Sequence, residues 1–161
     1  ADFPKLKVFA TLSPIPGLRS WLTKNAARML DQTPEKMRGQ LGLAVGFEPP
    51  TAAHVLSALD TVVTLDDRSA LRQWLLACAA QYLGKELTDD RPTDPVARFH
   101  LGNGARVEHI HWGADVSAKG LKQSWGLMVN YLYDLRKIDK HRQILATGKA
   151  PVSSDIDKLF F

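Results

Sequence analysis

The sequence predicts an α+β fold, on three observations. A short apolar run at 6–12 opens the chain, helical patterning fills about 18–84, and strand-like segments follow at 105–112 and 125–133. Strands on both sides of a helical block favour one mixed β-sheet flanked by helices, with the block as an insertion between two sheet elements. A chain of 161 residues has the length of one domain.

The first predicted element is a short strand over Leu6–Leu12. The segment Ser13-Pro14-Ile15-Pro16-Gly17 follows, and its two prolines lack the backbone donors that a regular strand or helix interior needs. We therefore expect the strand to end there. Ser13 before Pro14 is typical of a helix N-cap with proline in the first turn.

Helices are expected across 18–84 because apolar residues recur there at i, i+3 and i+4. Each expected helix opens at a cap or proline signal, with the hydroxyl of Thr33 as one cap. The expected starts are Leu18, Thr33-Pro34-Glu35, Pro49-Pro50-Thr51 and Asp66 or Asp67, and the last helix stops at Gly84.

The remaining residues predict shorter elements. Residues 88–94 read as a polar loop, and Asn103-Gly104 is a strong β-hairpin signal. Alternation over 105–112 places Val107, His109 and His111 on one face of a strand. Further expected elements are a loop at 115–120, a buried strand at 125–133, a basic turn or helix at 136–142, and a terminal helix at 155–161 capped from Ser153 or Ser154.

Composition excludes several classes of protein. The chain is 45% apolar and 24% charged, which is ordinary for a folded domain. It has no run of 18 apolar residues that predicts a membrane span, and the single cysteine, Cys78, excludes an internal disulfide framework. The N-terminus ADFPKLKVFA has no initiator Met and no apolar signal region, so we expect a fragment of a larger protein.

Two polar residues stand out as candidates for chemistry. Ser13 is either a helix cap or a hydroxyl that meets a ligand's negative charge at a helix N-terminus. His100, between Phe99 and Leu101, is either a structural residue or a general acid, because imidazole titrates near neutral pH. The residues alone do not choose between these readings.

Other polar clusters have ordinary explanations. His109 and His111 share a strand face, and with His100 they could supply three metal ligands, but a half-exposed strand face is the simpler interpretation and no metal is expected. The basic cluster Arg136–Arg142 is either a solvated face or a phosphate contact, for a nucleotide-like ligand or nucleic acid. Cys78 lies on an apolar helix stripe and is expected to be inert core.

Three segments resemble the catalytic domain of malonyl-CoA decarboxylase, in the same order. They are FATLSPIPGLRSWL at 9–22, DPVARFHLGNGA at 94–105 and ADVSAKGLKQSWGLMVNYLYDL at 114–135. This resemblance implies a GNAT-like acyltransferase fold, present in part, for which 1–161 would be the C-terminal portion. The family's helical N-terminal domain, its CoA pyrophosphate loop and the start of its fold are expected before Ala1.

The resemblance also implies an activity and a site. The expected reaction is decarboxylation of malonyl-CoA to acetyl-CoA and CO2 through a thioester enolate, with no metal or organic cofactor, since the thioester carbonyl takes up the electron pair. Ser13 and His100 are the implied catalytic pair. The resemblance suggests Tyr133, Asn130 and Ser117 as further substrate-binding residues, although a regular strand would place Asn130 and Tyr133 on opposite faces.

Further expectations concern partners, location and rival functions. We expect malonyl-CoA as substrate, no nucleic-acid or membrane partner, and a homo-oligomer formed through regions outside this chain. The C-terminus Leu159-Phe160-Phe161 lacks a peroxisomal tripeptide, which favours a bacterial, cytoplasmic setting. The alternatives are a CoA acyltransferase or non-catalytic acyl-CoA-binding domain of the same fold, a basic nucleic-acid-binding module, and a purely structural interaction domain.

Overall fold

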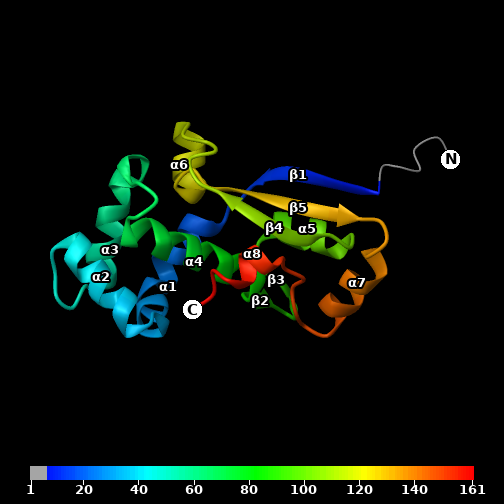
Figure 1. The fold of residues 1–161 in the computed structure, drawn as a ribbon, viewed down its shortest axis with the longest axis horizontal. Coiled ribbons are helices and arrows are strands. Elements are labelled where there is room, and N and C mark those ends of the chain that lie inside the picture. Colours follow the sequence, from blue (N-terminus) through cyan, green and yellow to red (C-terminus); the bar gives the residue numbers. More distant parts are fainter. Residues whose placement is uncertain (1–6) are drawn as a thin grey trace.

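The computed structural model describes residues 7–161, and a three-stranded antiparallel sheet lies at its centre (Figure 1). The strands are β1 (Val8–Pro14), β4 (Arg106–His111) and β5 (Met128–Asp134), in the spatial order β1-β5-β4. The α+β prediction is confirmed. The named strand pairs of the described residues are antiparallel rather than mixed, and the parallel element is an isolated bridge between Val107 and Val152.

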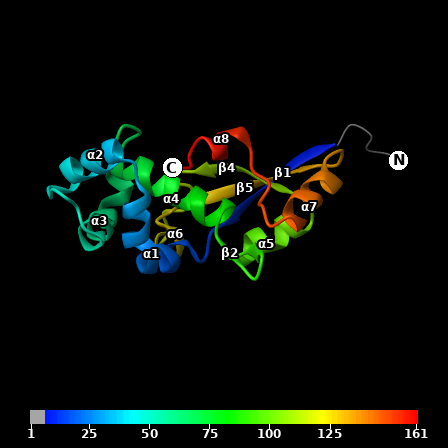
Figure 2. The same ribbon diagram turned by 90° about the horizontal axis from the view of Figure 1, so that it is seen from below.

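The helices predicted across 18–84 are present, and this helical insertion between β1 and the later strands in sequence forms one end of the molecule (Figures 1 and 2). Its elements are α1 (Leu18–Gln32), α2 (Glu35–Val45), α3 (Ala52–Ala58), the 3-10 helix η1 (Leu59–Thr64) and α4 (Ala70–Gly84). The helices form because their apolar residues lie on stripes that bury together. The largest wholly buried side chains of this block are Leu18, Leu22, Met29, Leu41, Leu59, Trp74, Leu75 and Leu83.

Two predicted helix caps are wrong because their side chains have other partners. The Thr33 hydroxyl donates to the Met29 carbonyl at 2.7 Å and accepts from Trp74 Nε1 at 2.9 Å, so it joins α1 to α4 and does not cap α2. Asp66 accepts from the backbone N–H of Arg68 in a local turn. Ser69, the next hydroxyl along the chain, caps α4 by accepting from Arg72 N.

The rest of the chain supplies short elements around the sheet. They are β2 (Leu87–Thr88), β3 (Arg91–Pro92), α5 (Pro95–Gly102), α6 (Ala118–Ser124), α7 (Ile138–Ala146) and α8 (Ser154–Asp157). The polar segment 88–94 therefore holds a tight hairpin, and the expected loop at 115–120 ends inside α6. Trp125 follows α6 with a left-handed backbone conformation, so the buried strand predicted from residue 125 begins at Met128 instead. Ser153 caps α8, as one of the two predicted caps.

The expected hairpin at Asn103-Gly104 is wrong, because these residues end a helix. Asp94 accepts from the N–H groups of Val96 and Ala97, and Pro95 occupies the first turn, so the chain enters α5 here. Gly104 has a φ of +91°, and an added Cβ would lie 2.6 Å from Ile138 Cγ2. Only glycine meets both conditions, and the chain turns here from α5 into β4.

The alternation predicted for 105–112 is broken by a β-bulge. Val107 pairs with Tyr131 and His109 pairs with Asn130, which leaves Glu108 as an extra residue on β4. Val107 and Ile110 are consequently both buried, whereas His109 is exposed. Val107 therefore does not share a face with His109 and His111. The first predicted strand is displaced as well: it runs from Val8 to Pro14, and Leu6 lies outside the described residues.

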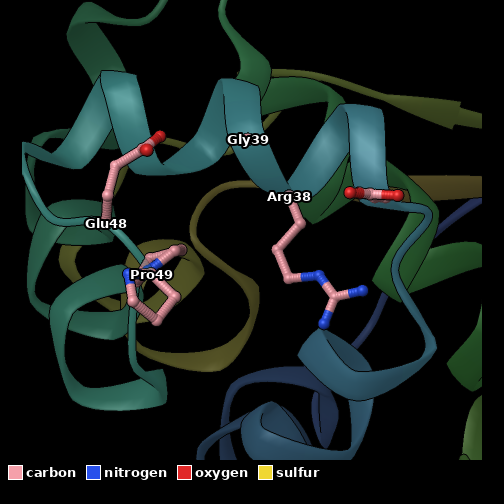
Figure 3. A pocket seen from close by; sticks show the side chains of 6 residues that line it. Arg38, Gly39, Glu48 and Pro49 are labelled. Carbon is pink, nitrogen blue, oxygen red and sulfur yellow. The ribbon is translucent and has the colours of Figure 1, made fainter.

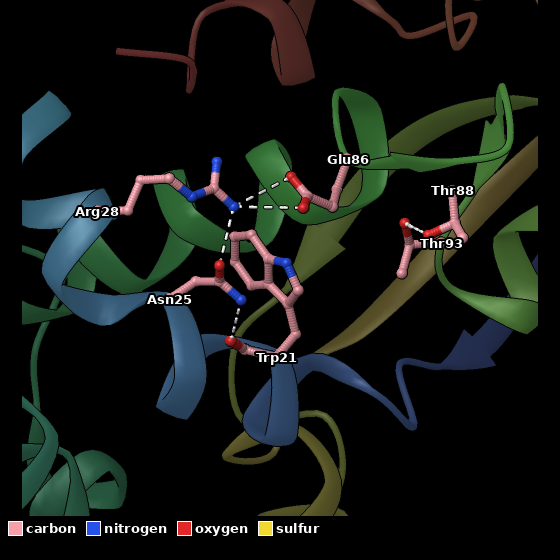
Figure 4. Close-up of polar contacts among 6 residues, drawn as sticks. All are labelled: Trp21, Asn25, Arg28, Glu86, Thr88 and Thr93. Atoms are coloured by element: carbon pink, nitrogen blue, oxygen red, sulfur yellow. Dashed lines mark hydrogen bonds and ion pairs between the residues drawn. The ribbon is translucent and has the colours of Figure 1, made fainter.

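A polar cluster ties the helical insertion to the segment after α4 (Figure 4). The Arg28 guanidinium donates to Asn25 Oδ1 at 3.1 Å and to Glu86 Oε1 at 3.3 Å, and it lies 5.7 Å from the centre of the Trp21 ring. The contacts connect α1 with the chain that leads towards α5.

Within residues 7–161, no helix is long and apolar enough to cross a membrane.

Candidate active site

Ser13 lies inside β1, paired with Val129, and not at the start of a helix. Gly17 is the residue that precedes α1, and it makes no side-chain capping bond. The helix-cap interpretation of Ser13 is therefore wrong. Pro14 can continue the strand because β1 is an edge strand, where a missing backbone donor is tolerated. The Ser13 hydroxyl is then available to another element, and its Oγ lies 3.3 Å from His100 Nε2.

The pleat of the sheet explains why Ser13 faces α5. Alternate residues of a strand share a face, so Phe9, Thr11 and Ser13 point to one side of β1. Their partners in the register are Tyr133, Tyr131 and Val129, which line the same side of β5. Phe9 stacks on Tyr133 with ring centres 4.9 Å apart. One face of the β1–β5 pair thus presents the Ser13 hydroxyl and the phenol rings of Tyr131 and Tyr133 to the helix that carries His100.

His100 reaches this face from the last turn of α5. Its Nδ1 lies 2.6 Å from the Tyr133 hydroxyl, and its ring stacks on Tyr131 with centres 4.5 Å apart. The end of α5 is held by α7, since His141 Nδ1 donates to the Gly104 carbonyl at 2.9 Å. The two predicted candidates, Ser13 and His100, are therefore brought together although 87 positions separate them in sequence.

The surroundings keep the side chains of His100 and Tyr133 neutral near pH 7. Burial lowers the pKa of His100 below its usual 6.5. Burial also raises the pKa of Tyr133, and a hydrogen bond from the Asn103 side chain opposes that rise. A neutral imidazole has one donor and one acceptor nitrogen, so His100 can donate to only one of Ser13 and Tyr133. The site is a chain of three neutral hydroxyl and imidazole groups.

Asp94 is a supporting residue that the sequence reasoning missed. Its buried carboxylate caps α5 and also accepts from the Tyr82 hydroxyl at 3.2 Å. It therefore ties α4 to the helix that carries His100. Burial raises the pKa of this carboxyl. The signal was visible in the sequence, because Asp-Pro is a common helix start.

The structure places Asn130 and Ser117 outside the Ser13–His100 contact. Asn130 donates to the Thr11 carbonyl at 2.9 Å and accepts from His111 Nε2, on the opposite face of the sheet from Tyr133. The regular β1–β5 register confirms that Asn130 and Tyr133 alternate. Ser117 caps α6 by accepting from Gly120 N, and its own N–H donates to Asp115. Both remain predictions as substrate contacts.

The metal interpretation gains no support from the geometry. His109 and His111 lie edge to face with ring centres 4.5 Å apart, and His100 lies at the opposite face with Tyr131 and Tyr133. Among residues 7–161, no three His, Cys, Asp or Glu side chains gather where they could hold a metal ion.

In the basic cluster, Arg136 donates to the Asp134 carboxylate at 3.2 Å, so its guanidinium is already paired with a carboxylate of this chain.

A cavity of about 550 Å³ lies in the helical insertion (Figure 3). Arg38 and Gly39 of α2 line it, with Glu35, Glu48, Pro49 and Pro50. Its lining brings a cation and two carboxylates together without a hydroxyl or histidine. None of the predicted site residues borders this cavity, so the polar contacts at Ser13 and His100 form the better candidate.

We predict that His100 contributes to a loss of stability in acid. Its pKa is lower in the folded state than the 6.5 of an unperturbed histidine, so the unfolded chain binds more protons between the two values. The stabilisation that His100 contributes is complete above pH 6.5 and is lost as the pH falls through the lowered pKa. The free energy of unfolding, measured in urea at about pH 7.5 and about pH 5.5, should therefore be smaller at the lower pH. His100→Ala should reduce this pH dependence, and an identical dependence in both proteins would contradict the prediction.

Comparison with known proteins identifies relatives along nearly the whole chain. The family model of the malonyl-CoA decarboxylase C-terminal domain matches residues 1–160. Two mitochondrial malonyl-CoA decarboxylases, from Anser anser anser and Mus musculus, are 34% and 38% identical over 144 and 146 residues. These matches cover 83% and 84% of the chain, but only 28% and 29% of the relatives.

Solved structures of bacterial relatives have the same fold. The crystal structure of malonyl-CoA decarboxylase from Cupriavidus metallidurans is 42% identical, with a TM-score of 0.86 over 99% of the chain and 40% of that structure. The enzyme from Rhodopseudomonas palustris is 36% identical, with a TM-score of 0.73 over 96% of the chain and 33% of that structure. The chain thus spans two fifths or less of the proteins that it matches.

Proposed function

The chain belongs to the malonyl-CoA decarboxylase family, and from this premise we propose that it carries the catalytic residues that convert malonyl-CoA to acetyl-CoA and CO2. The observation that supports the proposal most directly is the 3.3 Å approach of Ser13 Oγ to His100 Nε2. Both residues lie in motifs that resemble the family, and the fold brings them together from β1 and α5. The relatives are named for this carboxy-lyase reaction.

The chemistry requires hydrogen-bond donors more than a strong nucleophile. Loss of CO2 moves an electron pair from the broken C–C bond onto the thioester, which becomes an enolate. The enolate carbon then takes up one proton to give acetyl-CoA, so the net reaction consumes one proton. Donors that face the developing oxygen charge stabilise this transition state, and the thioester needs no metal or organic cofactor as electron sink. Orientation of the carboxylate out of the thioester plane adds to the rate.

The partners of His100 suggest how its proton is placed. The Tyr133 hydroxyl lies 2.6 Å from His100 Nδ1 and can donate its proton to that nitrogen. His100 Nε2 then carries the imidazole proton and faces Ser13. In this arrangement Nε2–H donates a hydrogen bond to the enolate oxygen, and the Ser13 hydroxyl donates to the malonyl carboxylate or relays the proton that the enolate carbon takes up from water. A neutral imidazole suits this role, because it donates without adding a full charge to the site.

The proposal extends to features that lie beyond this chain. We propose a GNAT-like fold for the complete catalytic domain, supported by the antiparallel sheet with helices against it and by the likeness to the solved decarboxylases. A homo-oligomer formed through other regions and a bacterial cytoplasmic setting belong to the same proposal. The solved relatives are bacterial, whereas the curated relatives are mitochondrial.

The experiment that tests the function measures CO2 and acetyl-CoA formed from malonyl-CoA by the natural full-length protein that contains this chain. Equal amounts of both products support the proposal. Transfer of the malonyl group from malonyl-CoA to an added amine or thiol, without release of CO2, would favour the CoA acyltransferase alternative. Saturable binding of malonyl-CoA with no product at all would favour a non-catalytic acyl-CoA-binding domain.

Tyr133→Phe should lower kcat by about fivefold to tenfold, because the lost hydrogen bond to His100 Nδ1 is worth roughly 1 kcal/mol. Without this bond the imidazole proton is shared between both nitrogens. The phenyl ring keeps the stack on Phe9, so the melting temperature should change little. Steady-state kinetics with malonyl-CoA and thermal melting measure both effects. A kcat equal to that of the wild type would show that Tyr133 does not set the state of His100.

A further inference from the structure

Tyr131 makes a contact with His100 that the proposed mechanism does not use. Its ring lies parallel to the imidazole, with an interplanar angle of 19° and centres 4.5 Å apart. The Tyr131 side chain is wholly buried on the face of β5 that carries Tyr133. Phe99, which is largely exposed, covers the imidazole edge to face at 5.1 Å. The imidazole therefore lies on a fixed aromatic surface on one side only.

The Tyr131 hydroxyl takes no part in the contact with His100. It is buried and has no hydrogen-bond partner among the described residues. The nearby Asp94 carboxylate accepts from Tyr82 instead, at 3.2 Å. An unpartnered buried hydroxyl costs stability and offers His100 nothing, because the contact between them is made by the two rings. The aromatic ring is therefore the part of Tyr131 that acts on His100.

We propose that Tyr131 is a positioning residue whose ring holds the imidazole of His100 in the plane where Nε2 meets Ser13 and Nδ1 meets Tyr133. The proposal deepens the proposed function and rests on it. The two hydrogen bonds of His100 lie at opposite edges of its ring, so a rotation of the ring weakens both together. The terminal torsion of histidine has only a shallow rotational preference, and a flat buried neighbour restricts it by contact.

The test compares Tyr131→Phe with Tyr131→Leu in the natural full-length protein. Tyr131→Phe keeps the flat ring, so kcat should remain within about twofold of the wild type. Tyr131→Leu removes it, and kcat should fall by about fivefold to tenfold with KM almost unchanged, the scale expected for loss of an aromatic contact. Tyr131→Ile, which suits a strand better, takes the place of the Leu variant if that protein does not fold.

Nitrogen NMR of His100 supplies a readout that does not depend on malonyl-CoA turnover. In the wild type and in Tyr131→Phe, the two ring nitrogens should have well separated shifts, as one tautomer predominates. In the Leu or Ile variant the shifts should approach each other. Leu41→Ala, in the distant helix α2, is a control for lost core packing and should leave the shifts unchanged.

Three outcomes would overturn the proposal. One is a Leu or Ile variant that keeps the wild-type shifts and kcat. Another is a Phe variant as defective as the Leu variant, since the hydroxyl would then be the important group. The third is a Leu41→Ala protein that changes the His100 shifts equally, which would make the effect a general loss of packing. If the full-length protein lacks decarboxylase activity, the NMR comparison still decides whether Tyr131 positions His100.

Discussion

His100→Ala should reduce the kcat for malonyl-CoA decarboxylation by about 100- to 1,000-fold, the usual scale for loss of one donor to a developing negative charge. The substitution removes the only imidazole near Ser13 in the described residues and leaves no group of similar acidity at this place. Alanine favours helix, and His100 is only partly buried, so the protein should remain folded. Single-turnover assays and thermal melting measure the two effects separately.

His109→Ala is the matched control for this substitution. His109 is exposed on β4, at the opposite face of the sheet, and contacts His111 rather than Ser13. Its removal should leave kcat within about twofold, because it contributes no donor to the site. Equal losses in the two variants, or a folded His100→Ala protein with the wild-type rate, would contradict a catalytic role for His100.

Ser13→Ala should reduce kcat by about 100-fold, because a hydroxyl that donates in the transition state has no substitute in alanine. The double variant Ser13→Ala/His100→Ala should lose much less than the product of the single losses. Residues that act as one unit are strongly non-additive, and these two lie 3.3 Å apart. Kinetics of the two single variants and the double variant complete the cycle.

Ser20→Ala controls for the loss of a serine hydroxyl. Ser20 is exposed on α1, and alanine at a helix surface is well tolerated, so activity should not change. If the losses of Ser13→Ala and His100→Ala multiplied fully, the two residues would act at separate points of the reaction. If Ser13→Ala had the wild-type rate, Ser13 would be a structural residue of β1.

The sequence was informative wherever a signal is local. Periodic apolar residues predicted helices between about 18 and 84, and the observed helices α1 to α4 confirm that prediction. Thr51 and Ser153 cap their helices near the places where the pattern indicated a start. Helix periodicity and caps depend on residues within a turn or two, so the chain itself carries the information. The motifs around Ser13 and His100 could also be recognised from the sequence alone.

The failed predictions share a different cause. Ser13 before Pro14 looked like a cap, but pairing with β5, more than a hundred positions away, keeps it in a strand. Asn103-Gly104 looked like a hairpin, but the packing of Ile138 against Gly104 makes it the end of α5. Thr33 looked like a cap, but its hydroxyl oxygen accepts a hydrogen bond from Trp74 Nε1. In each case a distant partner competed with the local preference and prevailed.

The sequence by itself determined the α+β class, the helical insertion and the two residues, Ser13 and His100, on which the proposed chemistry depends. Only the tertiary structure decided that Ser13 and His100 lie 3.3 Å apart, that Tyr133 and Tyr131 contact the edge and the face of the imidazole, and that Asn130 lies on the other side of the sheet. The physical reason is that strand register fixes which side chains share a face. Register is set by pairing between segments far apart in the chain, and no local pattern specifies it completely.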